Sequence, residues 1–160
     1  MKTRTFTVLL LTALLSATGM AQNKVLKSFL SYTTYNIPGS TPYVENALAF
    51  DQGSVVYKQI APGQYRAKVE ITTIFKQGEK VCNFSKVALD SPVVNDTVNL
   101  DGAFIDQQRF SLPNGEYQME INVMDMNNEK RTPYSVGQTV VVNYQKDVPA
   151  VSDILLIDSY

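Results

Sequence analysis

The run YRAKVEITTIFK, residues 65–76, alternates apolar and polar side chains with a period of two. Apolar or uncharged residues recur at every second position from Tyr65 to Phe75, and charged residues lie mostly in the opposite phase. Alternate side chains of an extended strand point to opposite faces of a sheet, so this run predicts a strand with one buried and one solvated face. A second run, YQMEINVMD at residues 117–125, repeats the pattern. Burial on one face only is typical of antiparallel sheets.

Further segments have the composition of short strands, and Gly, Pro, Asn and Asp separate them about every ten residues. They cover residues 26–35, 43–50, 55–59, 80–89, 103–110, 138–144 and 154–157. No stretch has the spacing of an amphipathic helix. We therefore predict an all-β fold, an antiparallel two-sheet β-sandwich of immunoglobulin-like type with seven to nine strands. An up-and-down barrel is the alternative architecture.

The N-terminal segment has the charged, apolar, small-residue order of a secretory signal peptide. Lys2 and Arg4 precede an apolar run, and small residues end at Ala21. That run is shorter than the roughly 18–20 residues needed to span a bilayer, so we expect cleavage and no membrane span. Residues 1–21 are the predicted signal, and residues 22–160 the predicted sandwich domain. Export would place the protein in the periplasm, at the outer membrane or outside the cell, and Gln22 after the cleavage point excludes a lipoprotein.

The composition excludes several classes of function. The 160 residues contain no His, no Trp and one Cys, so nucleophile systems built on His are absent. Fourteen basic against fifteen acidic residues give a net charge of -1, without the basic surplus of a nucleic-acid-binding protein. We predict no enzyme activity and no cofactor. A hydrolase using paired carboxylates is the weakest alternative, because it needs only two acids at a suitable distance.

The single cysteine, Cys82, cannot form an internal disulfide. An extended segment would place Cys82 and Phe84 on one face, which predicts a buried, unreactive thiol. Reactive or intermolecular use of this thiol is the alternative.

An acidic loop offers the only candidate metal ligands. Asp90, Asp96, Asp101 and Asp106 supply hard oxygen donors of the kind that Ca²⁺ prefers. Their spacing fits no EF-hand, and a solvated acidic loop is the alternative interpretation, so we predict no metal and keep these four as calcium candidates.

The same loop contains a candidate modification site. Residues 96–98, Asp-Thr-Val, match the short Asp-Thr/Ser-apolar sequence used as an O-glycan acceptor in some Gram-negative secretory systems. Thr97 would carry the glycan. The tripeptide also occurs often by chance.

Four tyrosines lie near predicted loops or strand ends: Tyr32, Tyr35, Tyr43 and Tyr134. Exposed aromatic rings could stack on a ligand such as a sugar, although packing at the rim of the sandwich is the alternative. Tyr117, after Gly115 and Glu116, resembles instead the tyrosine corner of Greek-key sandwiches, a structural feature.

Two further residues have structural interpretations. Tyr65, after Pro62 and Gly63, is expected to begin a long strand in the same way as Tyr117. Asp125 lies in the inward phase of its strand but just before Asn127 and Asn128, and we interpret it as the cap of a hairpin turn.

Several short motifs together suggest a family. They are Pro42-Tyr43-Val44-Glu45, Pro62-Gly63-Gln64-Tyr65, Leu112-Pro113-Asn114-Gly115-Glu116-Tyr117 with Val123-Met124-Asp125, and Val151-Ser152-Asp153-Ile154-Leu155-Leu156. The chain resembles the N-terminal β-sandwich region that precedes the GWxTD domain in exported proteins of Gram-negative bacteria. The resemblance implies an envelope location and a noncatalytic module, and it allows a second domain after residue 160. A chain without Trp does not contain the Gly-Trp-x-Thr-Asp motif itself.

We therefore expect a noncatalytic module of the bacterial cell envelope with a binding or assembly role, whose partner is an envelope protein or a glycan. A glycan-binding module is the alternative. The predicted edge strands at residues 55–59 and 154–157 could add to a partner's sheet, because an unpaired strand edge is a template for pairing.

Overall fold

The computed structural model describes residues 24–130, 132–145 and 148–154. Within these residues the chain forms nine strands and one short 3₁₀ turn, Gln52–Ser54, and no α-helix. The strands are β1 Ser28–Tyr35, β2 Tyr43–Asp51, β3 Lys58–Ala61, β4 Gln64–Arg66, β5 Lys68–Gln77, β6 Lys80–Asp90, β7 Ala103–Ser111, β8 Gly115–Asp125 and β9 Tyr134–Val142.

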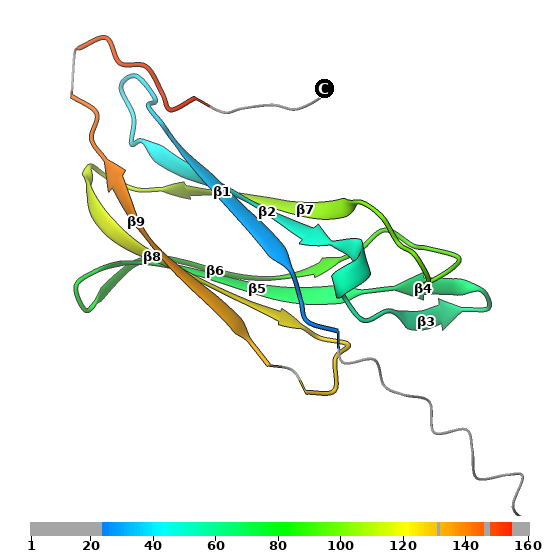
Figure 1. Cartoon of the computed structure of the whole chain (residues 1–160). Coiled ribbons are helices and arrows are strands. Elements are labelled where there is room, and N and C mark those ends of the chain that lie inside the picture. Colours follow the sequence, from blue (N-terminus) through cyan, green and yellow to red (C-terminus); the bar gives the residue numbers. More distant parts are fainter. Residues whose placement is uncertain (1–23, 131, 146–147, 155–160) are drawn as a thin grey trace, which may run out of the picture.

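Two antiparallel sheets face each other (Figure 1). The first has the order β1-β2-β7, and the second the order β6-β5-β8-β9. When the short β3-β4 hairpin is set aside, these orders correspond to strands A-B-E and C′-C-F-G of an immunoglobulin-like sandwich. The hairpin projects from one end of the molecule (Figure 1). The predicted all-β sandwich is confirmed, and the barrel alternative is wrong.

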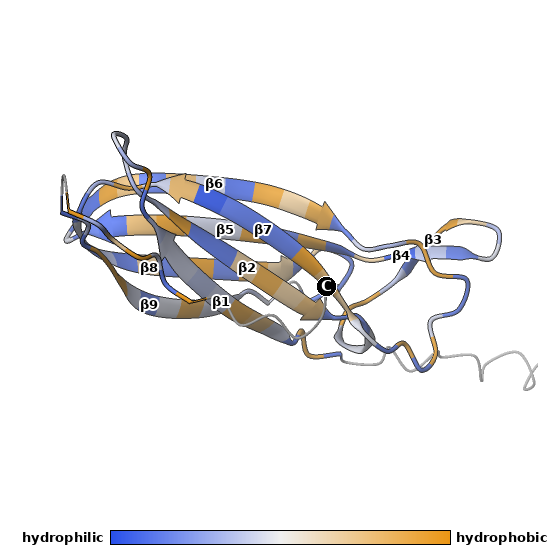
Figure 2. Cartoon of the chain, turned by 90° about the horizontal axis from the view of Figure 1, so that it is seen from above, coloured by the Kyte–Doolittle hydropathy of each residue, from blue (hydrophilic) through white to orange (hydrophobic). Residues whose placement is uncertain are grey.

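The core lies between the two sheets and follows the period-two pattern of the sequence (Figure 2). In β5, Val69, Ile71 and Phe75 are fully buried, and β8 buries its own alternate residues in register with them. Phe75 packs across the sandwich on Phe110 of β7, with ring centroids 4.9 Å apart. The residues that alternate with the buried ones in β5 and β8 lie on the outer face of the sheet, as the period of two predicts.

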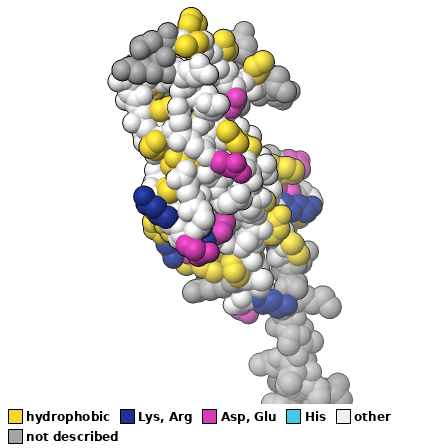
Figure 3. Space-filling view, turned by 90° about the vertical axis from the view of Figure 1, so that its left-hand side faces the viewer, with side chains coloured by type: hydrophobic (Ala, Val, Ile, Leu, Met, Phe, Trp, Pro, Cys, Tyr) yellow, Lys and Arg dark blue, Asp and Glu magenta, His cyan; other side chains and the backbone are white. Residues whose placement is uncertain are grey.

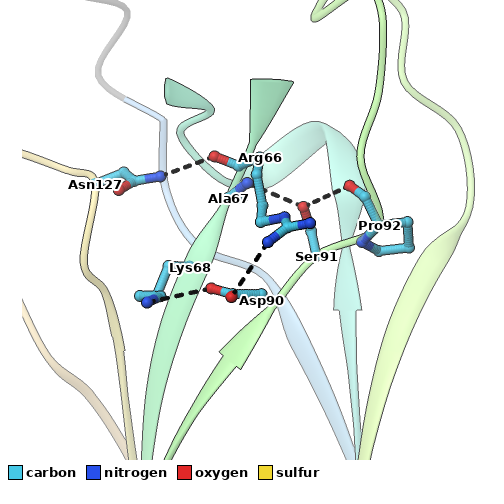
Figure 4. Close-up of polar contacts among 7 residues, drawn as sticks. All are labelled: Arg66, Ala67, Lys68, Asp90, Ser91, Pro92 and Asn127. Carbon is cyan, nitrogen blue, oxygen red and sulfur yellow. Dashed lines mark hydrogen bonds and ion pairs between the residues drawn. The ribbon is translucent and has the colours of Figure 1, made fainter. Parts of the chain in front are cut away.

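The long strand expected from Tyr65 to Lys76 is interrupted at Ala67. There the main-chain N–H of Ala67 donates to the Ser91 hydroxyl at 2.9 Å, and the N–H of Ser91 donates to the Ala67 carbonyl at 2.9 Å (Figure 4). Tyr65 belongs to β4, where it pairs with Gln59 and forms a bridge to Val94. The expected start of a long strand at Tyr65 is therefore wrong, because Ser91 takes the main-chain bonds at the junction.

Two other expected strands also differ. The strand expected at residues 55–59 begins only at Lys58, because Val55 turns into the core and is fully buried. Of the strand expected at 154–157, only Ile154 lies within the described residues, and it is outside any strand.

The expected common face of Cys82 and Phe84 is also wrong. A β-bulge shifts the β5–β6 register between Phe75 and Lys76, and Cys82 is the additional residue. Cys82 is half-buried against the core, whereas Phe84 faces outward beside Ile74 and is 56% exposed. The thiol is thus only partly buried.

The tyrosine corner is confirmed. Tyr117 is buried, and its hydroxyl donates to the carbonyl of Pro113 at 2.8 Å. The capping role of Asp125 is also confirmed: one carboxylate oxygen accepts from the N–H of Asn127 at 2.9 Å, and the other from the N–H of Val56 at 2.7 Å. Asp125 therefore caps its own turn and fixes the chain that leads into β3.

Candidate functional site

The outer face of the β1-β2-β7 sheet carries the strongest candidate site. The central strand β2 directs its odd-numbered residues, from Tyr43 to Asp51, away from the core. Register places the outward residues of β1 and β7 directly beside them, so the side chains form cross-strand rows. Two parts of this face differ in chemistry.

Near the start of β2 lies a group that we call the Tyr–Arg patch, formed by Tyr35, Tyr43, Glu45, Gln107 and Arg109. Tyr35 and Tyr43 are direct cross-strand partners, and their rings stack with centroids 4.9 Å apart and an angle of 18°. The Arg109 guanidinium lies 5.6 Å from the centre of the Tyr43 ring, in the range of a cation–π contact. The patch thus presents a stacked aromatic pair with a cation on one side.

Glu45 is buried although it lies on the outer face. Its two carboxylate oxygens accept from Nε of Arg109 and Nε2 of Gln107, each at 2.5 Å. The hydrogen bond and charge of Glu45 raise the pKa of the Arg109 guanidinium above its ordinary value. Both oxygens of Glu45 are thus occupied, and the side chain of Arg109 remains 69% exposed. The patch offers guanidinium and amide donors rather than a free carboxylate.

Toward the other end of the same face lies an apolar strip. Phe29 and Ile105 flank Ala49 as its direct partners on either side, and they are 70% and 63% exposed. The small Ala49 between two large apolar side chains leaves both of them open to contact. Burial of such side chains against a partner is favourable by about 25 cal/mol per Å² of apolar area.

The outer face of the other sheet is charged. Ion pairs join Lys76 to Glu120 at 2.7 Å and Lys86 to Glu70 at 2.9 Å across neighbouring strands. The side chains of these pairs are partly exposed to solvent. This face also exposes Phe84 of β6, whereas the β1-β2-β7 face brings two such side chains, Phe29 and Ile105, to either side of Ala49.

Two clefts lie at opposite ends of the sandwich. The first, of about 710 Å³, is lined by the β1–β2 loop, the β7–β8 turn and the segment after β9, and none of its described lining residues is charged. Figure 3 views this end and shows hydrophobic side chains among uncharged ones, with acidic and basic side chains mostly lower on the face. The second cleft, of about 600 Å³, includes Lys24, Lys58, Lys130 and Thr97.

Tyr57 lines the second cleft and is half-buried. Burial raises the pKa of Tyr57, and the nearby Ser91 hydroxyl opposes that shift. Ser91 already donates to the Pro92 carbonyl and accepts from Ala67 (Figure 4). The Tyr57 hydroxyl has no hydrogen-bond partner within the described part of the chain.

The four candidate tyrosines lie in three places. Tyr35 and Tyr43 meet in the Tyr–Arg patch. Tyr32 instead packs against the core and donates to the Thr139 carbonyl of β9 at 3.3 Å. Tyr134 is 54% exposed and borders a small crevice between β1 and β9. Rim packing describes Tyr32, and ligand stacking stays a prediction for the other three.

The four candidate aspartates are not brought together. Asp90 forms ion pairs with Arg66 at 3.6 Å and Lys68 at 3.4 Å (Figure 4). Asp96 accepts from the N–H of Val98, and Asp106 accepts from the Gln108 amide on β7. Asp101 lies exposed in the loop before β7.

Across residues 24–130, 132–145 and 148–154, no three His, Cys, Asp or Glu side chains lie close enough to hold a metal ion. The calcium hypothesis therefore has no geometric support there. Thr97, the candidate glycan acceptor, is half-buried beside exposed Asp96 at the second cleft.

Comparison of the chain with known protein families gave no match, and comparisons with curated proteins and with solved structures gave none either. No helix in the described part of the chain is long and apolar enough to cross a membrane. The site is therefore defined by its geometry alone.

Sequence reasoning missed Gln107 and Arg109 as members of the patch. Both lie in the outward phase of β7, and that signal was readable. Their contact with Glu45 depends on the pairing of β7 with β2, two strands about sixty residues apart, which alternation does not reveal.

Proposed function

We propose that this chain is a noncatalytic binding module of the bacterial cell envelope, exported by the signal at residues 1–21, and that it binds an envelope protein through the outer face of the β1-β2-β7 sheet. The observation that carries the proposal is the apolar strip, in which Phe29 and Ile105 expose most of their surface on either side of Ala49. Large exposed apolar side chains gathered on one face mark interaction surfaces.

The chemistry of the face indicates the kind of partner. Its only ion pair, Arg109 with Glu45, is satisfied within the face, so the surface has little net charge. An uncharged, partly apolar partner surface loses little hydration on contact with it. The resemblance to the region that precedes the GWxTD domain supports the envelope location and a role in assembly.

Carboxylate catalysis is the weakest alternative. Glu45 and Asp125 are the two buried carboxylates of the described chain, and each has both oxygens occupied by hydrogen bonds. The roles of these two groups are structural, which supports a noncatalytic module.

A glycan-binding module is the second candidate, and the Tyr–Arg patch favours it. Among the residues that the structure describes, Arg109 uses only Nε in a hydrogen bond, and the Tyr43 ring lies beside its guanidinium. Sugars are commonly bound by an aromatic face together with planar polar groups.

The experiment compares three variants of the mature chain, residues 22–160, with the unmodified chain in envelope pulldown and on a glycan array. Phe29→Ser with Ile105→Ser removes the strip, and Arg109→Ala alters the patch. Phe84→Ser is the matched control, because Phe84 is similarly exposed on the opposite sheet. Loss of a specific protein partner only with the double variant supports the proposal. Loss of a glycan signal only with Arg109→Ala supports the alternative, and binding unchanged in all forms would exclude this face.

A further inference from the structure

Lysine side chains gather at the second cleft, which has a volume of about 600 Å³. Lys24, Lys58 and Lys130 line it, together with a single acidic residue, Glu129. The charged residues of its described lining therefore leave a surplus of two positive charges, although the whole chain has a net charge of -1. The first cleft has no charged residue in its described lining, so the positive surplus is particular to the second.

These three lysines form no ion pair with any residue that the structure describes. That part of the chain contains ten basic residues, and five of them are paired with Asp or Glu. Of the other five, three line this one cleft. Ammonium groups that share a cleft repel one another, and a bound anion relieves that repulsion. The charge of the cleft is therefore suited to an anionic ligand.

The side chain of Asn128 joins two of the segments that carry these lysines. Its Nδ2 donates to the Lys24 carbonyl at 3.3 Å, and its Oδ1 accepts from the N–H of Lys130 at 3.1 Å. The main chain before β1 is thereby held against the β8–β9 turn. The fold itself fixes where Lys24 and Lys130 begin.

The neighbouring Asn127 holds the third segment. Its Nδ2 donates to the Val56 carbonyl at 3.0 Å and to the Arg66 carbonyl at 3.1 Å, the second of which is drawn in Figure 4. Lys58 lies two residues after Val56, and Tyr57 between them packs against the core. Three segments far apart in the sequence thus meet at one end of the sandwich (Figure 1). The main chain of the cleft is therefore preformed.

The cleft also has an apolar wall. Val56, Tyr57 and Val98 line it, and Val98 is 64% exposed. Thr97 adds a hydroxyl group, which can donate a hydrogen bond. Clefts of about 300–1,000 Å³ are typical of small-molecule sites, in which apolar walls surround a few polar groups. The space exceeds what a small anion fills, so an organic group can lie against the wall.

We propose that the second cleft binds a phosphate monoester carried on a small organic group, with Lys58 and Lys130 at the phosphate and Val98 against the organic part. A phosphate monoester carries about 1.5–2 negative charges at pH 7, which matches the surplus of two, whereas a carboxylate brings only one. Lysine binds phosphate as a point charge. The proposal depends on neither the apolar strip nor the Tyr–Arg patch, so its failure leaves the proposed protein-binding face untouched.

Calorimetric titration of the mature chain, residues 22–160, tests the proposal at low salt, where screening is weak. We expect binding of glucose 6-phosphate and of inorganic phosphate, and none of glucose. Lys58→Gln with Lys130→Gln should weaken binding of glucose 6-phosphate by about tenfold. Both lysines are exposed, so the variant should keep its fold, as circular dichroism would show.

The matched control is Lys27→Gln with Lys80→Gln. It removes the same charge from two exposed lysines that are not among the described lining residues, and it should change the affinity by less than about twofold. Equal weakening in the two double variants, equal affinity for glucose, or no binding of either phosphate compound would overturn the proposal.

Glu129 gives a test of opposite sign. It is exposed, and its carboxylate opposes an anion in the cleft that it lines. Glu129→Gln should therefore lower the Kd for glucose 6-phosphate by about threefold. Glu79→Gln makes the same chemical change at an exposed turn between β5 and β6 and should leave the Kd unchanged. No gain in Glu129→Gln, or an equal gain in both variants, would contradict an anion in this cleft.

Vesicles distinguish a lipid from a soluble source of the phosphate. They consist of phosphatidylcholine with or without phosphatidic acid, a lipid whose headgroup is a phosphate monoester. If the chain sediments only with phosphatidic acid, and only the Lys58→Gln/Lys130→Gln variant loses this, the phosphate belongs to a lipid. If it binds glucose 6-phosphate without sedimenting, the ligand is a soluble phosphate monoester. Sedimentation that both double variants lose equally, without binding of glucose 6-phosphate, would overturn the proposal.

Discussion

The hydroxyl of Tyr117, at the start of β8, donates a 2.8 Å hydrogen bond to the carbonyl of Pro113, four residues earlier. The bond closes the turn that carries the chain from one sheet to the other. The ring itself is buried in the core. One residue thus links the two sheets by packing and fixes their connection by a hydrogen bond.

Replacing Tyr117 with Phe should lower the free energy of unfolding by about 1 kcal/mol, because the Pro113 carbonyl loses its partner while the ring is kept. Tyr65→Phe is the matched control: Tyr65 follows a similar turn, but its hydroxyl makes no hydrogen bond in the described structure. Urea unfolding monitored by circular dichroism measures both. If both variants lose the same free energy of unfolding, the hydrogen bond from Tyr117 to Pro113 does not contribute specifically to stability.

Stability should also fall at high pH. Burial, with a smaller contribution from the charge of Cys82, raises the pKa of Tyr117 above its ordinary value of 10.0. Burial shifts the pKa of Tyr57 in the same direction. The unfolded chain then releases these protons first, so the stabilisation is complete below about pH 10 and declines as the pH rises through the folded-state values.

The measurement is the free energy of unfolding from pH 8 to pH 11. The double variant Tyr57→Phe/Tyr117→Phe should show a shallower alkaline decline than the unmodified chain. An identical decline would assign the loss of stability to other groups.

Replacing Thr73 with Val should stabilise the protein. Its side chain is fully buried in β5, and its hydroxyl has no hydrogen-bond partner within the described residues. Thr73→Val removes an unsatisfied polar group from the core and should raise the free energy of unfolding by about 1 kcal/mol. Thr72→Val, on the solvated face of the same strand, should change it by less than about 0.5 kcal/mol. If Thr73→Val instead lowers the free energy of unfolding, the Thr73 hydroxyl is hydrogen-bonded in solution, for example to a bound water, and the prediction is wrong.

The sequence located the strongest strands because each has one buried face. β5 and β8 bury alternate residues, and their limits differ from those expected by only a few residues. The tyrosine corner and the Asp125 cap were also predictable, because each is built from neighbours in the sequence. Local chemistry and periodicity therefore carried these predictions.

The break between β4 and β5, the bulge in β6 and the Tyr–Arg patch could not be predicted, because each depends on contacts between residues far apart in the sequence. The break at Ala67 arises from Ser91, and the exposure of Phe84 follows a bulge in the pairing of β5 with β6. The Tyr–Arg patch exists because β7 pairs with β2, which brings Arg109 beside Glu45. Periodicity identifies the outward residues of a strand but not the strand beside it.

Thr97 provides a test of modification. It is half-buried at the rim of the second cleft, beside an exposed Asp96. If the Asp-Thr-Val tripeptide is an acceptor, the protein secreted by its native host should carry an added glycan mass that Thr97→Ala abolishes. Intact mass spectrometry measures this, and an unmodified mass excludes the glycan. The same spectrum tests cleavage after Ala21.

Asp125 accepts hydrogen bonds from two main-chain N–H groups that belong to different parts of the chain. Asp125→Asn leaves one acceptor oxygen and turns an amide donor toward the other N–H. Because Asp125 is buried, a main-chain group is left without a partner, and the free energy of unfolding should fall by about 2–3 kcal/mol. Asp96→Asn makes the same chemical change at an exposed turn and should cost less than about 0.5 kcal/mol. Amide exchange at Val56 separates causes: faster exchange there in Asp125→Asn indicates loss of this contact, whereas a uniform change across the chain would contradict it.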